Sequence, residues 1–132
     1  MKSIKSIVVL ILFSLSIASC AQEDAIIGVW DVKNQYNEAI YEIVEYQGKF
    51  FGKTHYYNDG KTEYKGNSKK EDYFLTDVEK IDGKYINGKM YTPDGRFYQV
   101  IFSFKNDNTL EAKMTVDDQP YTETWVRNTS YK

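Results

Sequence analysis

The residue types that most often do chemistry are scarce in this sequence, which has one histidine, His55, and one cysteine, Cys20. A zinc-type metal site needs a set of His, Cys or carboxylate ligands, and His55 has no second His to complete one. A serine nucleophile needs a neighbouring base, and no candidate pair can be assembled. We therefore expect His55 to lie on the surface, and we predict no catalytic group, metal or cofactor. An enzyme is the least favoured class of function.

The motif around the cysteine offers a different chemistry. Lys2 and Lys5 precede an apolar run of 12 residues at 7–18, and small residues follow it. This is the pattern of a secretory signal, because a membrane span needs roughly 20 apolar residues. Residues 17–20, IASC, resemble a bacterial lipobox, in which the cysteine receives diacylglycerol and becomes the mature N-terminus. Ordinary signal cleavage after Ala21 is the alternative.

This interpretation divides the chain into a signal peptide at 1–19, a lipidated N-terminus and tether at 20–25, a folded domain at 26–128 and a tail at 129–132. Two or three acyl chains on Cys20 anchor a protein stably, whereas a single chain is marginal. We expect an exported protein, held by this lipid at the outer membrane or in the periplasm, with soluble secretion as the alternative. Removing the two lysines of the signal leaves 15 basic against 19 acidic residues, a net charge of −4. Nucleic acid is therefore not an expected partner.

The elements that position the remaining polar residues are strands. The clearest are two runs within 84–104 that flank the turn Thr92-Pro93-Asp94-Gly95. Pro93 presets φ and Gly95 supplies the left-handed residue, so this turn fixes the register of a hairpin with one apolar face. The predicted pairs are Met90–Tyr98, Lys89–Gln99, Gly88–Val100 and Ile86–Phe102.

A second hairpin at 39–57 turns at Gln47-Gly48. Its register places Glu42 opposite Lys53 and Ile40 opposite His55, and this charged face is expected to meet solvent. The predicted inner face consists of Tyr41, Ile43, Phe50, Gly52, Thr54 and Tyr56.

The rest of the chain supplies more short strands. We expect strands at 26–32, 73–76, 109–116 and 121–127, a long loop at 58–72 and a turn at 77–83. Eight short strands in succession with tight turns predict an all-β fold. The favoured form is an eight-stranded antiparallel up-and-down barrel, because closure leaves no unpaired edge. A two-sheet sandwich is the alternative.

Two signals near the ends of the domain strengthen the barrel prediction. Gly28-x-Trp30 on the first strand and Trp125-x-Arg127 on the last resemble the calycin pattern of lipocalins and fatty-acid-binding proteins. The resemblance implies that Trp30 plugs the closed end of the barrel and that Arg127 lies across it, as a cation over an indole face.

The segment 88–98, GKMYTPDGRFY, is similar to a secreted bacterial family catalogued as domain of unknown function 2147. Its hairpin includes Pro93 and Gly95, and the similarity continues through 108–110 and 124–127. Because the activity of that family is not established, this resemblance implies a lipocalin-like architecture and an exported location but no reaction.

Glu123 is the carboxylate of most interest, because it shares a face with Trp125 and Arg127. A carboxylate inside an apolar barrel needs a partner, which Arg127 or a ligand's hydroxyl or amine would supply. The slightly preferred alternative is that the mouth of the barrel is wet and Glu123 is solvated.

Two functions follow from this fold. The first is a binding protein that holds a small apolar or amphipathic ligand in a cavity of at least about 300 Å³, open at one end. Its candidate interior contacts are Tyr41, Phe50, Tyr56, Tyr98, Phe102, Glu123 and Trp125. The second is a structural or interaction protein of the cell envelope, with a filled barrel and an outer face bearing exposed tyrosines such as Tyr85 and Tyr91.

Overall fold

The computed structural model describes residues 23–65 and 73–131. The predicted signal peptide, the lipid site at Cys20 and the second half of the predicted 58–72 loop lie outside the described residues. Within the described ranges every regular element is a β-strand. None of these segments forms a helix with the length and hydropathy needed to cross a membrane.

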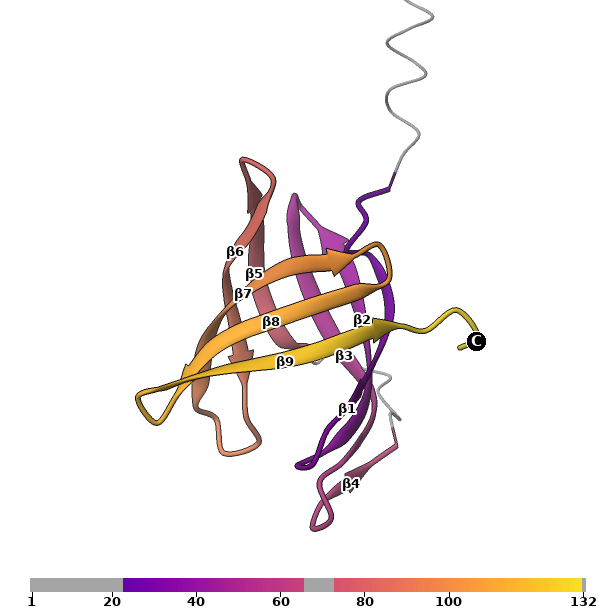
Figure 1. The fold of residues 1–132 in the computed structure, drawn as a ribbon, viewed down its shortest axis with the longest axis vertical. Helices are drawn as coiled ribbons and strands as arrows, with labels where there is room; N and C mark the ends of the chain where they lie inside the picture. Colours follow the sequence, from indigo (N-terminus) through magenta and orange to yellow (C-terminus); the bar gives the residue numbers. More distant parts are fainter. Residues whose placement is uncertain (1–22, 66–72, 132) are drawn as a thin grey trace, which may run out of the picture.

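Eight of the nine strands in the described part of the chain close into an antiparallel barrel (Figure 1). Each barrel strand pairs with the next along the chain, and β1 pairs with β9 to complete the ring, so the barrel prediction is confirmed and the sandwich is wrong. The short β4 pairs with the end of β3. The strands are β1 (Gly28–Lys33), β2 (Glu38–Tyr46), β3 (Lys49–Asn58), β4 (Glu63–Tyr64), β5 (Tyr73–Ile81), β6 (Lys84–Tyr91), β7 (Phe97–Asn106), β8 (Thr109–Val116) and β9 (Gln119–Arg127).

The turn between β6 and β7 has the predicted geometry. Gly95 has a φ of 87°, and its N–H donates to the Thr92 carbonyl at 3.0 Å. A residue with positive φ matches the right-handed twist of the strands it joins. Three of the predicted pairs next to this turn are confirmed: Met90–Tyr98, Lys89–Gln99 and Gly88–Val100.

The fourth predicted pair of this hairpin is wrong, because β6 carries a bulge. Phe102 lies opposite Tyr85 rather than Ile86, and Asn87 has a φ of 64° at the irregularity. An extra residue in one strand reverses which side chains face the interior beyond it. Tyr85, expected to be exposed, is therefore buried at 5 % exposure, whereas Tyr91 is exposed as expected.

A second bulge changes the end of β3. Tyr41 pairs with Thr54 as predicted, but Ile40 pairs with Tyr56 and leaves His55 as the extra residue. Tyr57 consequently lies opposite the buried Ala39 and packs against the core. The prediction that Tyr56 faces the interior is wrong, and Tyr57 takes that place.

Two segments expected to be irregular contain strands. β5 continues to Ile81 through the region 77–81 that was predicted to be part of a turn, with Asp77 at a positive φ of 61°. The predicted loop after β3 folds back at once, because Asp59 accepts the backbone N–H groups of Lys61 and Thr62 and so positions β4. By contrast, the alternation predicted for 109–116 is confirmed, with Leu110 and Ala112 buried.

Candidate functional site

One end of the barrel is closed by the first described residues and by a cation on an indole ring. The Arg127 guanidinium carbon lies 4.4 Å from the centre of the Trp30 ring, and the Trp30 indole N–H donates to the Ile26 carbonyl at 3.1 Å. Arg127 also donates to the Ala25 carbonyl at 2.7 Å. Gly28 has a φ of 141°, which other residues rarely adopt, and a Cβ there would come within 3.1 Å of the Arg127 Nη1, so glycine is favoured at this position. The arrangement implied for Trp30 and Arg127 is confirmed.

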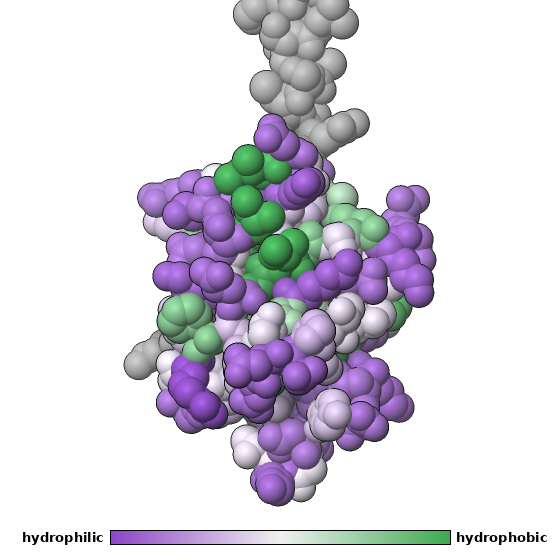
Figure 2. Space-filling view, turned by 60° about the vertical axis from the view of Figure 1, so that its left-hand side comes forward, coloured by the Kyte–Doolittle hydropathy of each residue, from purple (hydrophilic) through white to green (hydrophobic). Residues whose placement is uncertain are grey.

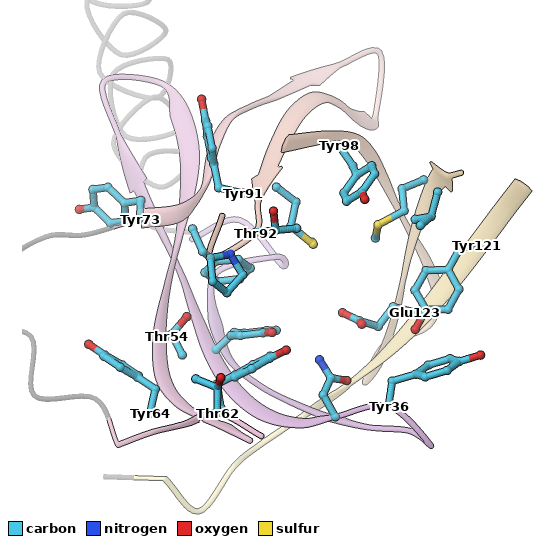
Figure 3. Close-up of a pocket in the computed structure, with 18 of the residues that line it drawn as sticks. Tyr36, Thr54, Thr62, Tyr64, Tyr73, Tyr91, Thr92, Tyr98, Tyr121 and Glu123 are labelled. Carbon is cyan, nitrogen blue, oxygen red and sulfur yellow. The ribbon is translucent and has the colours of Figure 1, made fainter. Parts of the chain in front are cut away.

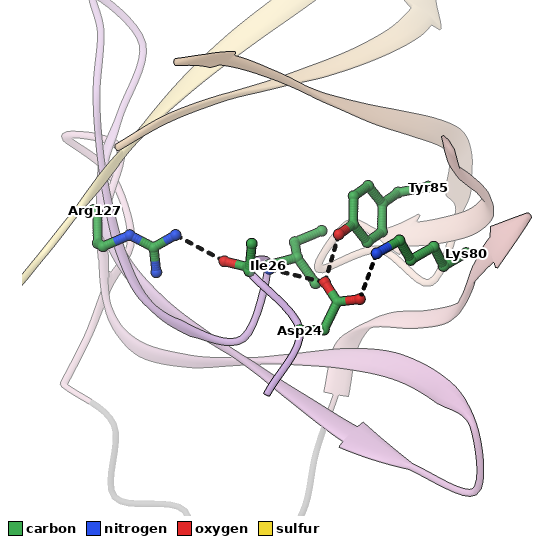
Figure 4. A network of polar contacts seen from close by, with 6 residues as sticks. Asp24, Ile26, Lys80, Tyr85 and Arg127 are labelled. Atoms are coloured by element: carbon green, nitrogen blue, oxygen red, sulfur yellow. Dashed lines mark hydrogen bonds and ion pairs between the residues drawn. The ribbon is translucent and has the colours of Figure 1, made fainter. Parts of the chain in front are cut away.

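Asp24 fastens the N-terminal segment to the opposite wall of this closed end (Figure 4). Its carboxylate accepts hydrogen bonds from the Tyr85 hydroxyl and the Ile26 N–H, and it pairs with Lys80 at 3.1 Å. Burial by itself raises the pKa of this carboxyl, but the three donors outweigh burial and the pKa of Asp24 is lowered. Ile26 is fully buried as a result and acts as the apolar part of the closure.

The other end of the barrel opens into a cavity of about 960 Å³ (Figure 3). Its mouth is formed by the turns that join β1 to β2, β3 to β4 and β6 to β7, which contribute Asn37, Thr62 and Pro93, and by the start of β9, which contributes Gln119. An antiparallel meander brings alternate turns to the same end, and the closed end carries the others. The cavity therefore enters the barrel from the end opposite to Asp24.

Tyrosines dominate the cavity wall. The deepest, Tyr41, is 6 % exposed, and its ring centre lies 4.2 Å from that of Phe74 and 5.0 Å from that of Trp125. Near the mouth, Tyr36 is 64 % exposed. Such rings offer apolar faces with a hydroxyl that can bond a ligand or water. The lining tyrosines are Tyr36, Tyr41, Tyr57, Tyr64, Tyr73, Tyr91, Tyr98 and Tyr121.

Glu123 points from β9 toward the middle of this cavity (Figure 3). It is only 8 % exposed, and its Oε1 accepts the Trp125 indole N–H at 2.9 Å. Burial raises the pKa of its carboxyl, and the hydrogen bonds from Trp125, Tyr121 and Asn34 only partly oppose that rise. The preferred expectation of a solvated Glu123 is therefore wrong, and its partner is not Arg127.

The cavity brings together some of the predicted interior residues and leaves out others. Tyr41, Tyr98 and Glu123 line it. Trp125, Phe102 and Phe50 are buried in the core, with Phe102 packed against Trp125 at 5.1 Å between ring centres. Tyr56 does not line the cavity, because the bulge at His55 shifts the register of β3 and puts Tyr57 in its place.

Several lining residues were not predicted. Tyr57 was missed because a bulge shifts the register of β3, and Phe74 was missed because β5 is longer than predicted. Neither the bulge nor the extension of β5 leaves a clear signal in the local sequence. Tyr36 lies in the turn between β1 and β2, and Tyr64 belongs to the two-residue strand β4. Neither stretch has an alternation long enough to assign a face. Thr54 and Met90 could have been added from the predicted hairpins, because both lie on faces expected to point inward. Met114 and Val116 could have been added from the alternation in 109–116, which puts them on the same face as Leu110.

His55 lies on the outside of the barrel, away from the cavity. Its Nε2 lies 2.7 Å from Glu42 Oε1, and its ring stacks on Tyr131 at 4.6 Å between centres. Among residues 23–65 and 73–131, no cluster of three or more His, Cys, Asp or Glu side chains is arranged to hold a metal ion.

Comparison with known proteins supports the fold. No protein-family model matches the chain, and a search of curated proteins finds no match. A solved structure described as "Protein HP1028 from the human pathogen Helicobacter pylori belongs to the lipocalin family" superposes with a TM-score of 0.62 at 21 % sequence identity. The superposition covers 80 % of this chain and 84 % of that one. The chain therefore has a lipocalin-like fold, an eight-stranded barrel of the size that can hold one small ligand.

Proposed function

We propose that this protein binds a small apolar or amphipathic ligand in its open-ended cavity. The observation that carries the proposal is the cavity of about 960 Å³ with its wall of tyrosine, phenylalanine and methionine side chains. Small-molecule sites are commonly concave, mostly apolar and roughly 300–1,000 Å³ in volume, with a few polar groups that orient the ligand. Glu123 is such a group.

The experiment is the binding of N-phenyl-1-naphthylamine, a neutral apolar dye whose fluorescence rises in apolar surroundings. The wild-type protein should bind it, and Met114→Trp should weaken binding at least about tenfold, since Met114 lines the cavity and the indole would occupy ligand volume. Thr115→Trp is the matched control, because Thr115 is the next residue on β8 and is exposed. Absence of dye binding by the wild type, or equal loss in both variants, would contradict the proposal.

We further propose that the protein is exported and anchored by lipid at Cys20 in a bacterial cell envelope, and that it belongs to the family of domain of unknown function 2147. The sequence of the signal segment and the lipobox-like IASC support export and lipidation. Mass spectrometry of the protein from its host should find an acylated chain that begins at Cys20. A mature chain that begins at Gln22 and carries no acyl group would contradict the anchor and leave export standing.

A second candidate function is a protein-interaction surface on the outer wall. Figure 2, which brings the β5–β7 side forward, shows apolar side chains among hydrophilic ones on that face. Ile101 is 51 % exposed and Phe97 47 % exposed on β7. The filled barrel expected together with this function is wrong, because the barrel contains a cavity of about 960 Å³. Under this function, Ile101→Lys would abolish association with envelope extracts while dye binding is unchanged; retained association would exclude this face as the interaction surface.

A further inference from the structure

We infer that the ligand is an organic cation, an apolar body that carries a protonated amine, and that the amine sits against Glu123. The inference rests on the proposed binding function and narrows it to one chemical class. It depends on the charge of the lining, on an acceptor atom that lacks a donor, and on the aromatic wall.

The charge of the cavity is one-sided. Among the described residues that line it, Glu123 is the only charged side chain, and none is a lysine, an arginine or a histidine. Arg127, which shares its strand, is committed to the other end of the barrel by Trp30 and the Ala25 carbonyl. A carboxylate that is largely removed from water is stabilised by a cation that comes close to it. Within residues 23–65 and 73–131, the cavity wall supplies hydrogen bonds to Glu123 but no counter-charge.

The carboxylate is held in place by its neighbours. Trp125 donates to Oε1 at 2.9 Å, and the side chains of Tyr121 and Asn34 also hydrogen-bond the group. Asn34 uses its carbonyl oxygen to accept the N–H groups of Tyr36 and Asn37, which leaves its amide nitrogen as the donor to Glu123. Donors that fix an acceptor before the ligand arrives reduce the ordering cost of binding.

A second acceptor lies next to this site. The Oδ1 of Asn37, a lining residue, is buried and has no hydrogen-bond partner. Asn34 contacts both Asn37 and Glu123, so the two acceptors share one side of the mouth. The amide of Asn37 faces Tyr57, whose hydroxyl donates to Asp59 at 3.4 Å, and this leaves the Asn37 carbonyl without a donor. A buried acceptor without a donor is costly, and the unpaired carbonyl adds a second oxygen with partial negative charge to the side of the cavity that holds Glu123.

The aromatic wall suits the same ligand. Tyr41, Tyr57 and Tyr121 lie close enough to Glu123 for its charge to raise the pKa of each hydroxyl, after the larger effect of burial. Aromatic rings near a carboxylate favour a cation over an anion, and the rest of the wall accommodates an apolar body. A fatty acid would place a second carboxylate beside Glu123, and like charges at such a site repel.

The test compares three probes with the same apolar chain: decylammonium, decan-1-ol and decanoate, each displacing N-phenyl-1-naphthylamine from the wild-type protein at pH 7.5. Decylammonium should bind about 10- to 100-fold more tightly than decanol, as expected for hydrogen bonds to a charged group, and decanoate should bind most weakly. In Glu123→Gln the preference for decylammonium over decanol, measured by titration calorimetry, should fall to within about threefold. Glu111→Gln, which removes the same charge from an outward-facing position on β8, should keep the full preference.

Two outcomes separate this inference from the proposed function. If the wild-type protein binds the neutral dye but prefers decanol or decanoate to decylammonium, the cavity binds apolar ligands and the assignment to cations is wrong. If neither dye nor any probe binds, the proposed function itself fails. A preference for decylammonium that persists unchanged in Glu123→Gln would also overturn the role given to Glu123.

Discussion

Gly88 on β6 offers the most direct test of how the core below the cavity is packed. A Cβ at this position would lie 2.8 Å from Val100 Cγ1, 2.8 Å from Val78 Cγ2 and 3.3 Å from the Val100 carbonyl oxygen. Carbon atoms in contact normally sit about 3.5–4.0 Å apart. Both valines are buried, and their branched side chains have little rotational freedom. Neither methyl group can move away without disturbing the packing around it.

We therefore expect Gly88→Ala to lower the free energy of unfolding by about 1–3 kcal/mol, the usual cost of overpacking a core. For a domain of this size each kcal/mol corresponds to about 4–8 °C in Tm. Urea unfolding followed by the fluorescence of the buried Trp30 and Trp125 measures the change. An unfolding midpoint equal to that of the wild type would refute the reasoning.

A double-mutant cycle with Val100→Ala tests the cause of this loss. Val100→Ala alone leaves a void and should destabilise the protein, but in the Gly88→Ala background it also removes one clash. The double variant should therefore be more stable than the sum of the single effects by about 0.5–3 kcal/mol. The rescue should be partial, because the contact with Val78 remains. Strict additivity would show that the two positions do not compete for space.

Three further changes test the closed end and the cavity. Arg127→Met should destabilise the fold by about 1–2 kcal/mol through the loss of its contact with Trp30, and a thermal melt equal to that of the wild type would contradict that contact. Asp24→Asn should cost about 1–2 kcal/mol at neutral pH. Because the pKa of Asp24 is lowered in the folded protein, the stability that its carboxylate contributes is present above the unfolded pKa near 3.8 and is lost as pH falls through the folded pKa. Denaturant melts should therefore show a smaller stability difference between Asp24→Asn and the wild type at pH 3 than at pH 7. Glu123→Gln should be more stable than the wild type at pH 7.5 and equal to it below about pH 4. The reason is that the pKa of Glu123 is raised in the folded protein, so the wild type loses stability as pH rises from the unfolded pKa through the folded pKa. Urea melts that show no gain in stability at pH 7.5 would argue against a buried carboxylate.

The fold was predictable where the chemistry of the chain is local. Pro93 and Gly95 define a turn whose geometry follows from their own backbone preferences, and the neighbouring pairs are as predicted. The predicted register holds as far as the pair Gly88–Val100 and fails at the bulge near Asn87, so that Phe102 does not pair with Ile86. The only sequence signal there is an asparagine, which tolerates positive φ better than most residues, and that signal is too common to place a bulge.

The candidate site was less predictable, because its shape depends on contacts between distant segments. The pairing of Glu123 with Trp125 could be read from two same-face positions on one strand. The burial of Glu123 could not, since it requires Asn34 and the β1–β2 turn to fold over the last strand. The bulge at His55 likewise exchanged Tyr56 for Tyr57 on the cavity wall.

The fastening of Asp24 has a geometric consequence for any molecule that reaches the cavity. Asp24 lies at the sealed floor of the cup, and Cys20 precedes it by only a few residues. An acyl anchor on Cys20 would press that floor toward the bilayer and turn the rim to the surrounding fluid. Cargo would then be exchanged with the aqueous compartment or with a passing carrier, and not drawn directly from the lipid leaflet beneath.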